Sequence, residues 1–297
     1  MPLSVPNFSE GRDPARIAAI RATLSEGATV LDRHSDRDHH RTVFTVYGPP
    51  ETLGRALVDA ADLAARSIDM HRHRGLHPCI GALDVCPIVW HRPEDRGEAI
   101  DLAYSVAEQI GALQIPAFLY GDLATTDQRR ERAYFREGGL PALERRMSDG
   151  ELRPDRGPDR PHSRAGATLI TARPPLAAFN VELDTADPGI AKQVAAQLRE
   201  SAPGGEGLPG VRAIGLYLGA SGRAQVSTNV HDPFAVPLAV VTQRIAELAA
   251  AHGARPVAAE IVGLVPAAAL EGYPDDPPIH NRDDRRQTIE GVLASSE

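Results

Sequence analysis

Along residues 1–90, stretches of alternating or continuous apolar positions predict strands, and stretches with an apolar residue every three or four positions predict helices. The clearest helical segment has Asp13 as its N-cap and Pro14 in its first turn. The predicted elements are strand Leu3–Phe8, helix Asp13–Ser25, strands Thr29–Asp32 and Thr42–Tyr47, helix Pro49–Asp69 and strand Ala82–Trp90. This β-α-β-β-α-β order is typical of a ferredoxin-like unit.

The same order of patterns returns in the second half of the chain, with little repetition of individual residues. The predicted elements are strand Ala177–Leu183, helix Asp187–Glu200, a hairpin of Val211–Leu218 and Ala224–Val230, helix Pro233–His252 and strand Ala258–Val265. We therefore expect an α/β (α+β) protein made of two ferredoxin-like βαββαβ subdomains, residues 1–165 and 166–297.

Two further features extend the first unit and separate it from the second. A helix at Pro93–Ala112 and a strand at Ala117–Tyr120 follow the first set of elements. The segment Asp149–Ala165 is rich in Pro, Arg and Asp, so it is neither a helix nor a central strand. It is either a plain linker or a long ordered loop of the kind that often borders a ligand site.

Composition narrows the class of protein. The 297 residues are 42% hydrophobic and 24% charged, and no apolar run approaches the roughly 20 residues of a membrane helix. The N-terminal Met1–Ser4 lacks a signal-peptide pattern, and two cysteines make no disulfide framework, so we expect a cytoplasmic protein. A formal net charge of −8 argues against nucleic-acid binding.

The strongest candidate for chemistry is His77, in a Gly-Leu-His-Pro turn just before the predicted strand Ala82–Trp90. Pro78 restricts the backbone after it, and Gly75 allows a tight turn before it. A fixed imidazole at a strand entrance suits proton transfer, because its pKa lies near neutrality. The bland interpretation is a packed turn residue.

Other polar residues are candidates of less weight. Asn7 and Glu10 lie at a strand-to-helix turn, where they either bind a ligand or cap the turn. Arg41 and Arg74 either bind anionic substrates or form surface salt bridges. His39 and His40, with the nearby acids Asp36 and Asp38, fit no compact ligand spacing, so no metal site is expected.

Several collinear motifs resemble the formiminotransferase (glutamate formimidoyltransferase) family, including the N-terminal transferase domain of formimidoyltransferase-cyclodeaminase. These motifs are Val5-Pro6-Asn7-Phe8-Ser9-Glu10-Gly11, Arg41-Thr42-Val43, Gly48-Pro49-Pro50-Glu51, Gly81-Ala82-Leu83-Asp84-Val85-Cys86-Pro87, Tyr120-Gly121, Gly166-Ala167-Thr168, Ala178-Phe179-Asn180, Ala224-Gln225-Val226-Ser227-Thr228-Asn229 and Val262-Gly263-Leu264-Val265-Pro266. The resemblance implies two α/β subdomains with inward-facing sheets and a substrate tunnel between them. It also implies a homodimer.

The resemblance further implies an activity in one-carbon metabolism and histidine degradation. Members of this family move a formimidoyl group from N-formimidoyl-L-glutamate to N5 of tetrahydrofolate and release glutamate. The family's catalytic histidine matches His77, which would act as the general acid and base. Tetrahydrofolate would be the co-substrate, and neither a metal nor a covalent enzyme intermediate would be needed.

The folate-binding loop of the family aligns with one stretch of the segment between the two units. Its residues are Gly157, Pro158, Asp159, Arg160, Pro161, His162, Ser163, Arg164, Ala165 and Gly166. Arg160 and Arg164 would meet the folate carboxylates; solvated loop arginines are an equally good interpretation.

The departures from the family pattern cluster around the expected chemistry. Members usually read Gly-Glu-His-Pro-Arg around the histidine, where this chain has Leu76 and Cys79. The folate loop usually ends Ser-Trp-Gly, and here it ends Arg164-Ala165-Gly166. The chain stops at Glu297, so no cyclodeaminase domain is expected. These departures leave open a related transferase acting on a different small amine, or a folate-binding relative without catalysis.

Overall fold

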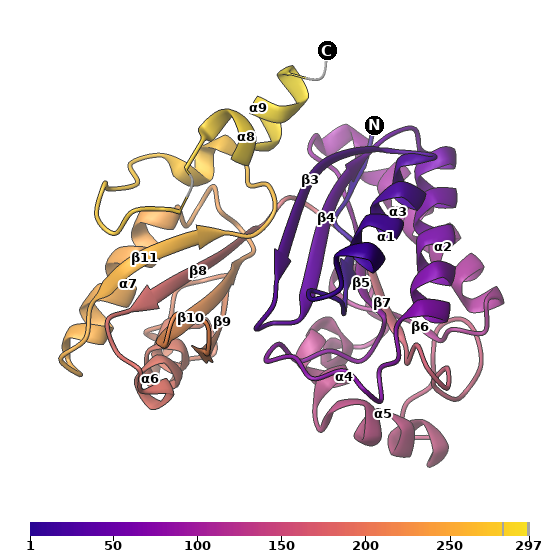
Figure 1. The fold of residues 1–297 in the computed structure, drawn as a ribbon, viewed down its shortest axis with the longest axis horizontal. Helices are drawn as coiled ribbons and strands as arrows, with labels where there is room; N and C mark the ends of the chain where they lie inside the picture. The colour runs from indigo at the N-terminus through magenta and orange to yellow at the C-terminus, as the bar shows by residue number, and fades with distance from the viewer. Residues whose placement is uncertain (281, 296–297) are drawn as a thin grey trace. The chain divides into compact units, whose positions relative to one another are not determined.

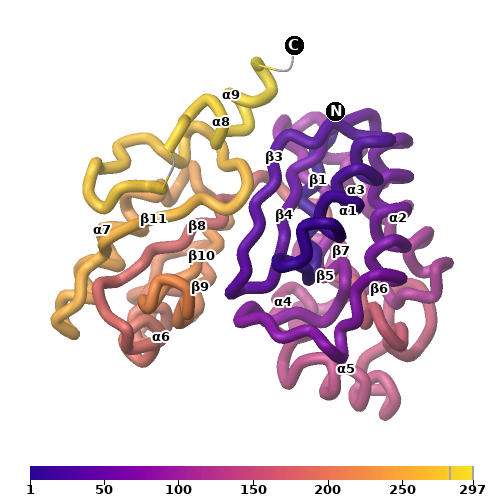
Figure 2. The backbone as a smooth tube through the Cα atoms, viewed as in Figure 1, coloured from indigo at the N-terminus to yellow at the C-terminus, as the bar shows by residue number. Residues whose placement is uncertain are grey.

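A computed structural model describes residues 1–280 and 282–295, and the chain divides into two compact units, Met1–Pro174 and Pro175–Glu297 (Figures 1 and 2). The division falls after Pro174 and not after residue 165, the boundary that the sequence favoured. The reason is strand β7 (Thr168–Arg173), which pairs in parallel with β5 (Leu83–Val89) and so belongs to the first unit.

The first unit contains a ferredoxin-like sheet that has been widened at one edge. β3 (Thr29–Asp36), β4 (Arg41–Tyr47), the pair β1 (Leu3–Ser4) and β2 (Asn7–Phe8), and β5 lie in that order and pair antiparallel. β7 and then β6 (Ala117–Leu119) are added in parallel beyond β5, which gives a seven-stranded mixed sheet. The predicted fold class is therefore confirmed, with an extension.

The first predicted strand, Leu3–Phe8, is divided into β1 and β2. Pro6 has no backbone N–H to donate, although its carbonyl still accepts from Phe44 N at 3.1 Å. The chain bends there, so that β1 and β2 each pair with β4 and β5.

Helices pack against both faces of this sheet. On one face, α1 (Pro14–Ser25), α2 (Pro50–Ser67) and α3 (Arg96–Ala112) pack over a core that includes Phe44 and Ile88. As predicted, Asp13 caps α1, because its side chain accepts from Ala15 N at 3.0 Å and Arg16 N at 3.1 Å.

The opposite face carries a smaller core, which includes Phe118, Phe135 and Leu143. Two helices that the sequence pattern did not predict lie here, α4 (Arg132–Arg136) and α5 (Gly139–Ser148). Short 3-10 turns complete the unit at Pro93–Asp95, Gly121–Leu123 and Asp127–Arg130.

The second unit is a ferredoxin-like fold without additions to its sheet. The antiparallel order is β11-β8-β10-β9, the arrangement expected for β-α-β-β-α-β connectivity. The strands are β8 (Ala177–Leu183), β9 (Val211–Leu218), β10 (Arg223–Val230) and β11 (Pro256–Ile261). The helices are α6 (Pro188–Leu198), α7 (Leu238–Ala250), α8 (Asp284–Gln287) and α9 (Ile289–Ala294). Short 3-10 turns lie at Pro203–Gly205 and Ala267–Leu270.

Two boundaries in this unit differ clearly from the predicted ones. β11 ends at Ile261 and not at Val265. α7 begins at Leu238 and not at Pro233, because Asp232 accepts from Phe234 N and Ala235 N and so forms a separate turn ahead of the helix. Within the described residues, no helix has the length and apolar character needed to cross a membrane.

Candidate active site

Three loops of the first unit meet around His77. The loop Met70–Ile80 is joined to the predicted folate segment by Met70 N, which donates to Arg164 O at 2.8 Å, and by a contact of 2.8 Å between His71 Nε2 and Ser163 O. Leu76 N donates to Asp38 O at 3.0 Å, which brings in the loop after β3. The predicted catalytic histidine and the predicted folate segment are therefore neighbours within one unit.

The predicted folate segment is an ordered loop and not a free linker. It folds back at a turn in which His162 N and Gly166 N exchange hydrogen bonds with each other's carbonyls at 2.8 and 2.9 Å. Gly166 has φ +70°, and a Cβ there would lie 2.0 Å from Ile80 O. Glycine is thus required where this loop passes the entrance of β5.

His77 is a partly buried imidazole whose tautomer the backbone selects. Its Nδ1 lies 2.8 Å from Pro78 O, and because a carbonyl only accepts, Nδ1 carries the hydrogen and Nε2 is left as the basic nitrogen. Burial lowers the pKa of His77 well below 6.5, and the charges of Arg41, Arg136 and other neighbours lower it further. The ring is therefore a neutral base near pH 7.

Asp84, at the start of β5, organises the charges beside His77. Its carboxylate is fully buried, and Oδ2 accepts both from Arg41 Nη1 at 2.8 Å and from Arg136 Nη2. Oδ1 accepts from Ile80 N at 2.9 Å. Burial alone would raise the pKa of Asp84, but the two guanidinium groups outweigh it and lower that pKa.

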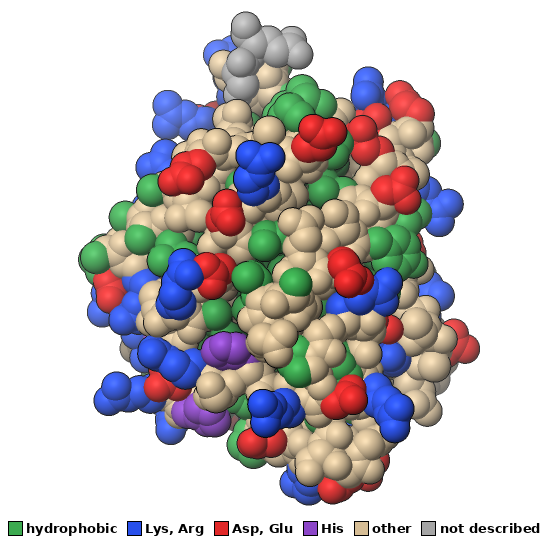
Figure 3. Space-filling view, turned by 90° about the vertical axis from the view of Figure 1, so that its right-hand side faces the viewer, with side chains coloured by type: hydrophobic (Ala, Val, Ile, Leu, Met, Phe, Trp, Pro, Cys, Tyr) green, Lys and Arg blue, Asp and Glu red, His purple; other side chains and the backbone are tan. Residues whose placement is uncertain are grey.

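A third guanidinium group, Arg132, lies close to this cluster on α4. Its charge acts on Arg136, Arg41 and Asp84, and its Cζ lies 6.0 Å from the centre of the Tyr120 ring. Within the part of the chain that the structure describes, Arg132 forms no ion pair. On the surface drawn in Figure 3, by contrast, basic and acidic side chains are mixed, and two histidines lie near each other.

Asn7 helps to hold the side chain of Arg41 in place. Asn7 Oδ1 accepts from Arg41 Nε at 2.9 Å, and Asn7 Nδ2 donates to Val5 O at 2.7 Å. Arg41 was expected either at the surface or in a substrate site. The structure shows a buried guanidinium group, held by Asn7 and Asp84 beside His77.

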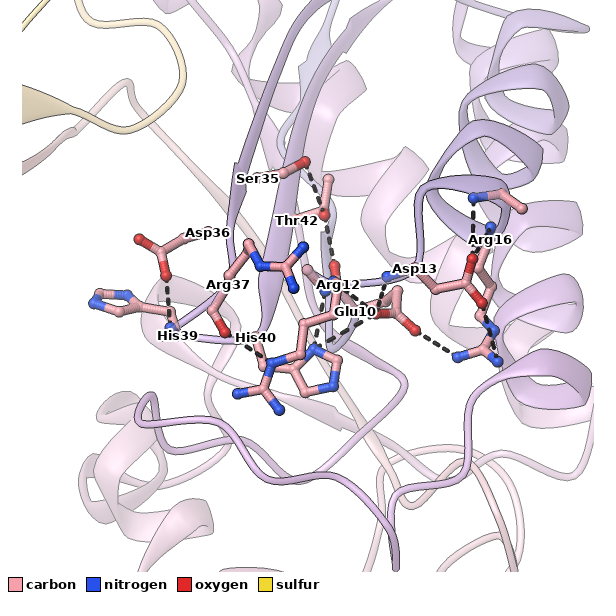
Figure 4. Close-up of polar contacts among 12 residues, drawn as sticks. Glu10, Arg12, Asp13, Arg16, Ser35, Asp36, Arg37, His39, His40 and Thr42 are labelled. Carbon is pink, nitrogen blue, oxygen red and sulfur yellow. Dashed lines mark hydrogen bonds and ion pairs between the residues drawn. The ribbon is translucent and has the colours of Figure 1, made fainter. Parts of the chain in front are cut away.

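Glu10 and Arg74 stabilise the loops around the site. Glu10 is buried and accepts from Arg12 N at 2.9 Å, from Asp13 N at 3.1 Å and from Arg16 Nη1 at 2.5 Å (Figure 4). Arg74 is exposed and donates to the carbonyls of His71 and His73, in its own loop. Glu10 therefore stabilises the start of α1, and Arg74 stabilises its own loop.

His39 and His40 point in opposite directions from the loop after β3 (Figure 4). The His39 ring lies 6.0 Å from that of His77, and the His40 ring stacks on that of His73 at 4.6 Å. Burial and the neighbouring His40 lower the pKa of His73 to about 4. Among residues 1–280 and 282–295, no group of three or more His, Cys, Asp or Glu side chains is arranged to hold a metal ion.

The two residues that depart from the family pattern lie in different surroundings. Leu76 is exposed at the surface. Cys79 is partly buried beside Asp84, Arg41 and Arg136, and burial raises the pKa of its thiol to about 11. Cys79 is thus a neutral thiol near pH 7.

Asp84, Arg132 and Arg136 were not identified as site residues from the sequence. For Asp84 a signal existed, because a carboxylate in an otherwise apolar strand requires a cationic partner. For the arginines the only signal is their spacing of four, which places both on one side of a helical turn.

The chain matches two family models, the N-terminal subdomain of the formiminotransferase domain over residues 1–173 and the formiminotransferase domain over residues 178–273. It is 38% identical to glutamate formimidoyltransferase of Streptococcus pyogenes serotype M1, over 90% of this chain and 89% of that protein. A glutamate formimidoyltransferase of Thermoplasma acidophilum is 35% identical over 90% of this chain and 88% of its own. Formimidoyltransferase-cyclodeaminase of Gallus gallus is 36% identical over 90% of this chain but only 50% of its own.

The fold and these matches define a transferase built from two α/β subdomains. The chain belongs to the formiminotransferase family, which confirms the resemblance seen in its sequence motifs.

Proposed function

We propose that this protein transfers the formimidoyl group of N-formimidoyl-L-glutamate to N5 of tetrahydrofolate, with His77 as the general acid and base. The family membership and the names of its relatives support the reaction. The observation that carries the role of His77 is the contact of 2.8 Å between its Nδ1 and Pro78 O, which leaves Nε2 as the basic nitrogen of a ring whose pKa is lowered by burial and by the neighbouring arginines.

The reaction requires one proton to move between two nitrogen atoms. N5 of tetrahydrofolate attacks the amidine carbon and forms a tetrahedral intermediate. Nε2 of His77 accepts the N5 proton and returns a proton to the glutamate nitrogen, after which the carbon–nitrogen bond to glutamate breaks. Atoms and charge balance without a metal, so we propose that chelators leave the activity unchanged.

We propose that residues 157–166 bind tetrahydrofolate. The loop is held against the His77 loop by Met70 N and His71 Nε2, so a bound folate could reach the imidazole within unit 1. Arg160 and Arg164 are exposed and form no ion pair within the described residues, which leaves both guanidinium groups available to carboxylates.

Cellular location, oligomeric state and pathway complete this proposal. We propose a cytoplasmic homodimer that acts on small molecules in histidine degradation. Light scattering at micromolar concentration tests the dimer, and a monomer would contradict it.

The His77→Ala variant tests the proposed chemistry. General acid–base catalysis contributes about 10²–10⁴-fold in rate, so turnover should fall by that factor. The affinity for tetrahydrofolate should remain within a few-fold, because the imidazole is not placed as a main binding group. His252→Ala, in the turn that follows α7 in the second unit, is the control. Near-normal turnover in His77→Ala would show that another group carries the proton or that the ring only packs.

A second candidate is the same transfer with a different small amine. It is favoured by the exposed Leu76 and the neutral Cys79, which stand where the family pattern has a carboxylate and a guanidinium group. Measuring kcat/KM with N-formimidoyl-L-glutamate separates the two candidates. A value many orders below the roughly 10⁴ M⁻¹s⁻¹ at the low end for working enzymes, with normal folate binding, would favour the second.

A further inference from the structure

The charged cluster beside His77 consists of Arg41, Arg132, Arg136 and Asp84. It holds more positive charge than its one acid can neutralise. Arg41 and Arg136 share a single oxygen of Asp84, whose other oxygen is occupied by Ile80 N. Arg132 adds a third guanidinium group and forms no ion pair in the described part of the chain. An anion brought to this cluster would meet two positive charges in excess.

A buried donor in the cluster also lacks a partner. Arg136 Nε is inaccessible to solvent and makes no hydrogen bond, although the Arg136 side chain is 9% exposed. A buried N–H without an acceptor is unfavourable, so such a group usually meets a water or a ligand oxygen. The side chain is thus held in place with donor capacity to spare.

We propose that Arg132 and Arg136, together with Arg41, bind a carboxylate of the amino-acid part of the formimidoyl donor. This inference rests on the proposed function and adds to it the residues that select an acidic donor. Asp84 serves as a positioning residue, because it holds Nη1 of Arg41 and Nη2 of Arg136 and does not occupy the remaining N–H groups of the two side chains.

The donor is the more suitable of the two possible sources of a carboxylate. In an N-formimidoyl amino acid, the α-carboxylate is only a few bonds from the amidine carbon, which must lie near His77. The carboxylates of tetrahydrofolate lie beyond its aminobenzoyl ring, far from N5. A cationic cluster whose charges act directly on the His77 ring therefore suits the donor.

Direct binding tests the inference without requiring turnover. Calorimetry would measure the affinity of N-formimidoyl-L-glutamate, of L-glutamate and of tetrahydrofolate for the wild-type protein and for Arg132→Gln and Arg136→Gln. The matched control is Arg130→Gln, an exposed arginine paired with Asp122 at 3.3 Å. Each site variant should bind the two glutamate ligands about 10–100-fold more weakly and tetrahydrofolate within a few-fold, whereas the control should bind all three as the wild type does.

The amide forms of the donor identify which carboxylate is bound. The analogue that lacks the recognised carboxylate should bind the wild-type protein weakly, and the Arg136→Gln substitution should reduce its affinity little further. Arg136→Lys, which keeps the charge but not the fork, should recover only part of the affinity. Circular dichroism checks that each variant is folded. Within the described residues Arg132 forms no ion pair, so its variant removes one positive charge from the cluster without breaking a direct contact of Asp84.

The outcomes separate this inference from the proposed function. Loss of tetrahydrofolate affinity alone would assign the cluster to the folate carboxylates and overturn the inference. Wild-type affinity for the glutamate ligands in both site variants would overturn it as well. If wild type binds N-formimidoyl-L-glutamate through these arginines but transfers nothing to tetrahydrofolate, the inference stands and the proposed function fails.

Discussion

Replacing Asp84 with Asn should destabilise the first unit strongly, because it removes the carboxylate that Arg41 and Arg136 share. The acid is fully buried and accepts three hydrogen bonds, from the two guanidinium groups and from Ile80 N. Removing one partner of a buried ion pair costs about 3–5 kcal/mol, since the remaining charges stay buried without compensation. An amide is close in shape, so the destabilisation reports charge and not a cavity.

Calorimetric unfolding gives the magnitude. For a domain of the size of the first unit, each kcal/mol shifts Tm by about 2–4 °C, so Asp84→Asn should lower Tm by roughly 6–20 °C. The control is Asp62→Asn on α2, whose exposed pair with Arg66 is worth about 0–1 kcal/mol. Equal Tm values for the two variants at pH 7 would refute the reasoning.

The pH dependence of the difference supplies a second check. The pKa of Asp84 is lowered in the folded protein, so its stabilising contribution is fully present above the unfolded value near 4. That contribution disappears as pH falls through the folded pKa. The gap in Tm between wild type and Asp84→Asn should therefore be constant from pH 7 down to about 4 and narrow below it. A gap that narrowed around pH 6 would point to a histidine instead.

Three further predictions concern binding and catalysis. The double variant Arg160→Ala/Arg164→Ala should weaken tetrahydrofolate binding by about 1.5–3 kcal/mol for each charge-assisted hydrogen bond that it removes, without a change in Tm. Unchanged affinity in calorimetry would show that the loop has only a structural role. Cys79→Arg should lower both Tm and kcat/KM for N-formimidoyl-L-glutamate, because the thiol lies beside Arg41 and Arg136 and a further guanidinium group there would repel them. A gain in kcat/KM would show that the wild-type site lacks a group that binds the donor carboxylate. The kcat/KM profile should stay flat to well below pH 6.5, since the pKa of His77 is lowered and the neutral ring is the base; a fall already at pH 6.5–7 would contradict this.

Local sequence signals predicted most of the two ferredoxin-like units. The cap at Asp13, the proline at the next position and the apolar spacing of α1 all act within one turn or two, so the sequence contains them directly. β7 was not predicted, because Thr168–Arg173 becomes a strand only through its parallel pairing with β5, a distant segment. α4 is a five-residue helix, too short for a periodic pattern to show.

The candidate site shows the same division between local and long-range information. His77 and the loop 157–166 could be singled out from motifs, and the structure brings them together in one unit. Arg41 could not be distinguished from a surface arginine, because its burial depends on Asp84 in another strand. Glu10 could not be distinguished from a ligand-binding acid until its contacts with the start of α1 were seen.

The low pKa of His77 and the excess of positive charge beside it have a common explanation in the proposed reaction. A ring held neutral by burial and by Arg41, Arg136 and Arg132 accepts a proton readily only if the cost of its positive charge falls at the moment of reaction. A carboxylate bound to those arginines would supply that change, since it cancels part of the charge that lowers the pKa. The donor would then raise the pKa of the base that acts on it, so an acidic donor would activate its own transfer while a neutral amine donor would not. On this view the arginines select the substrate through the proton transfer as well as through binding.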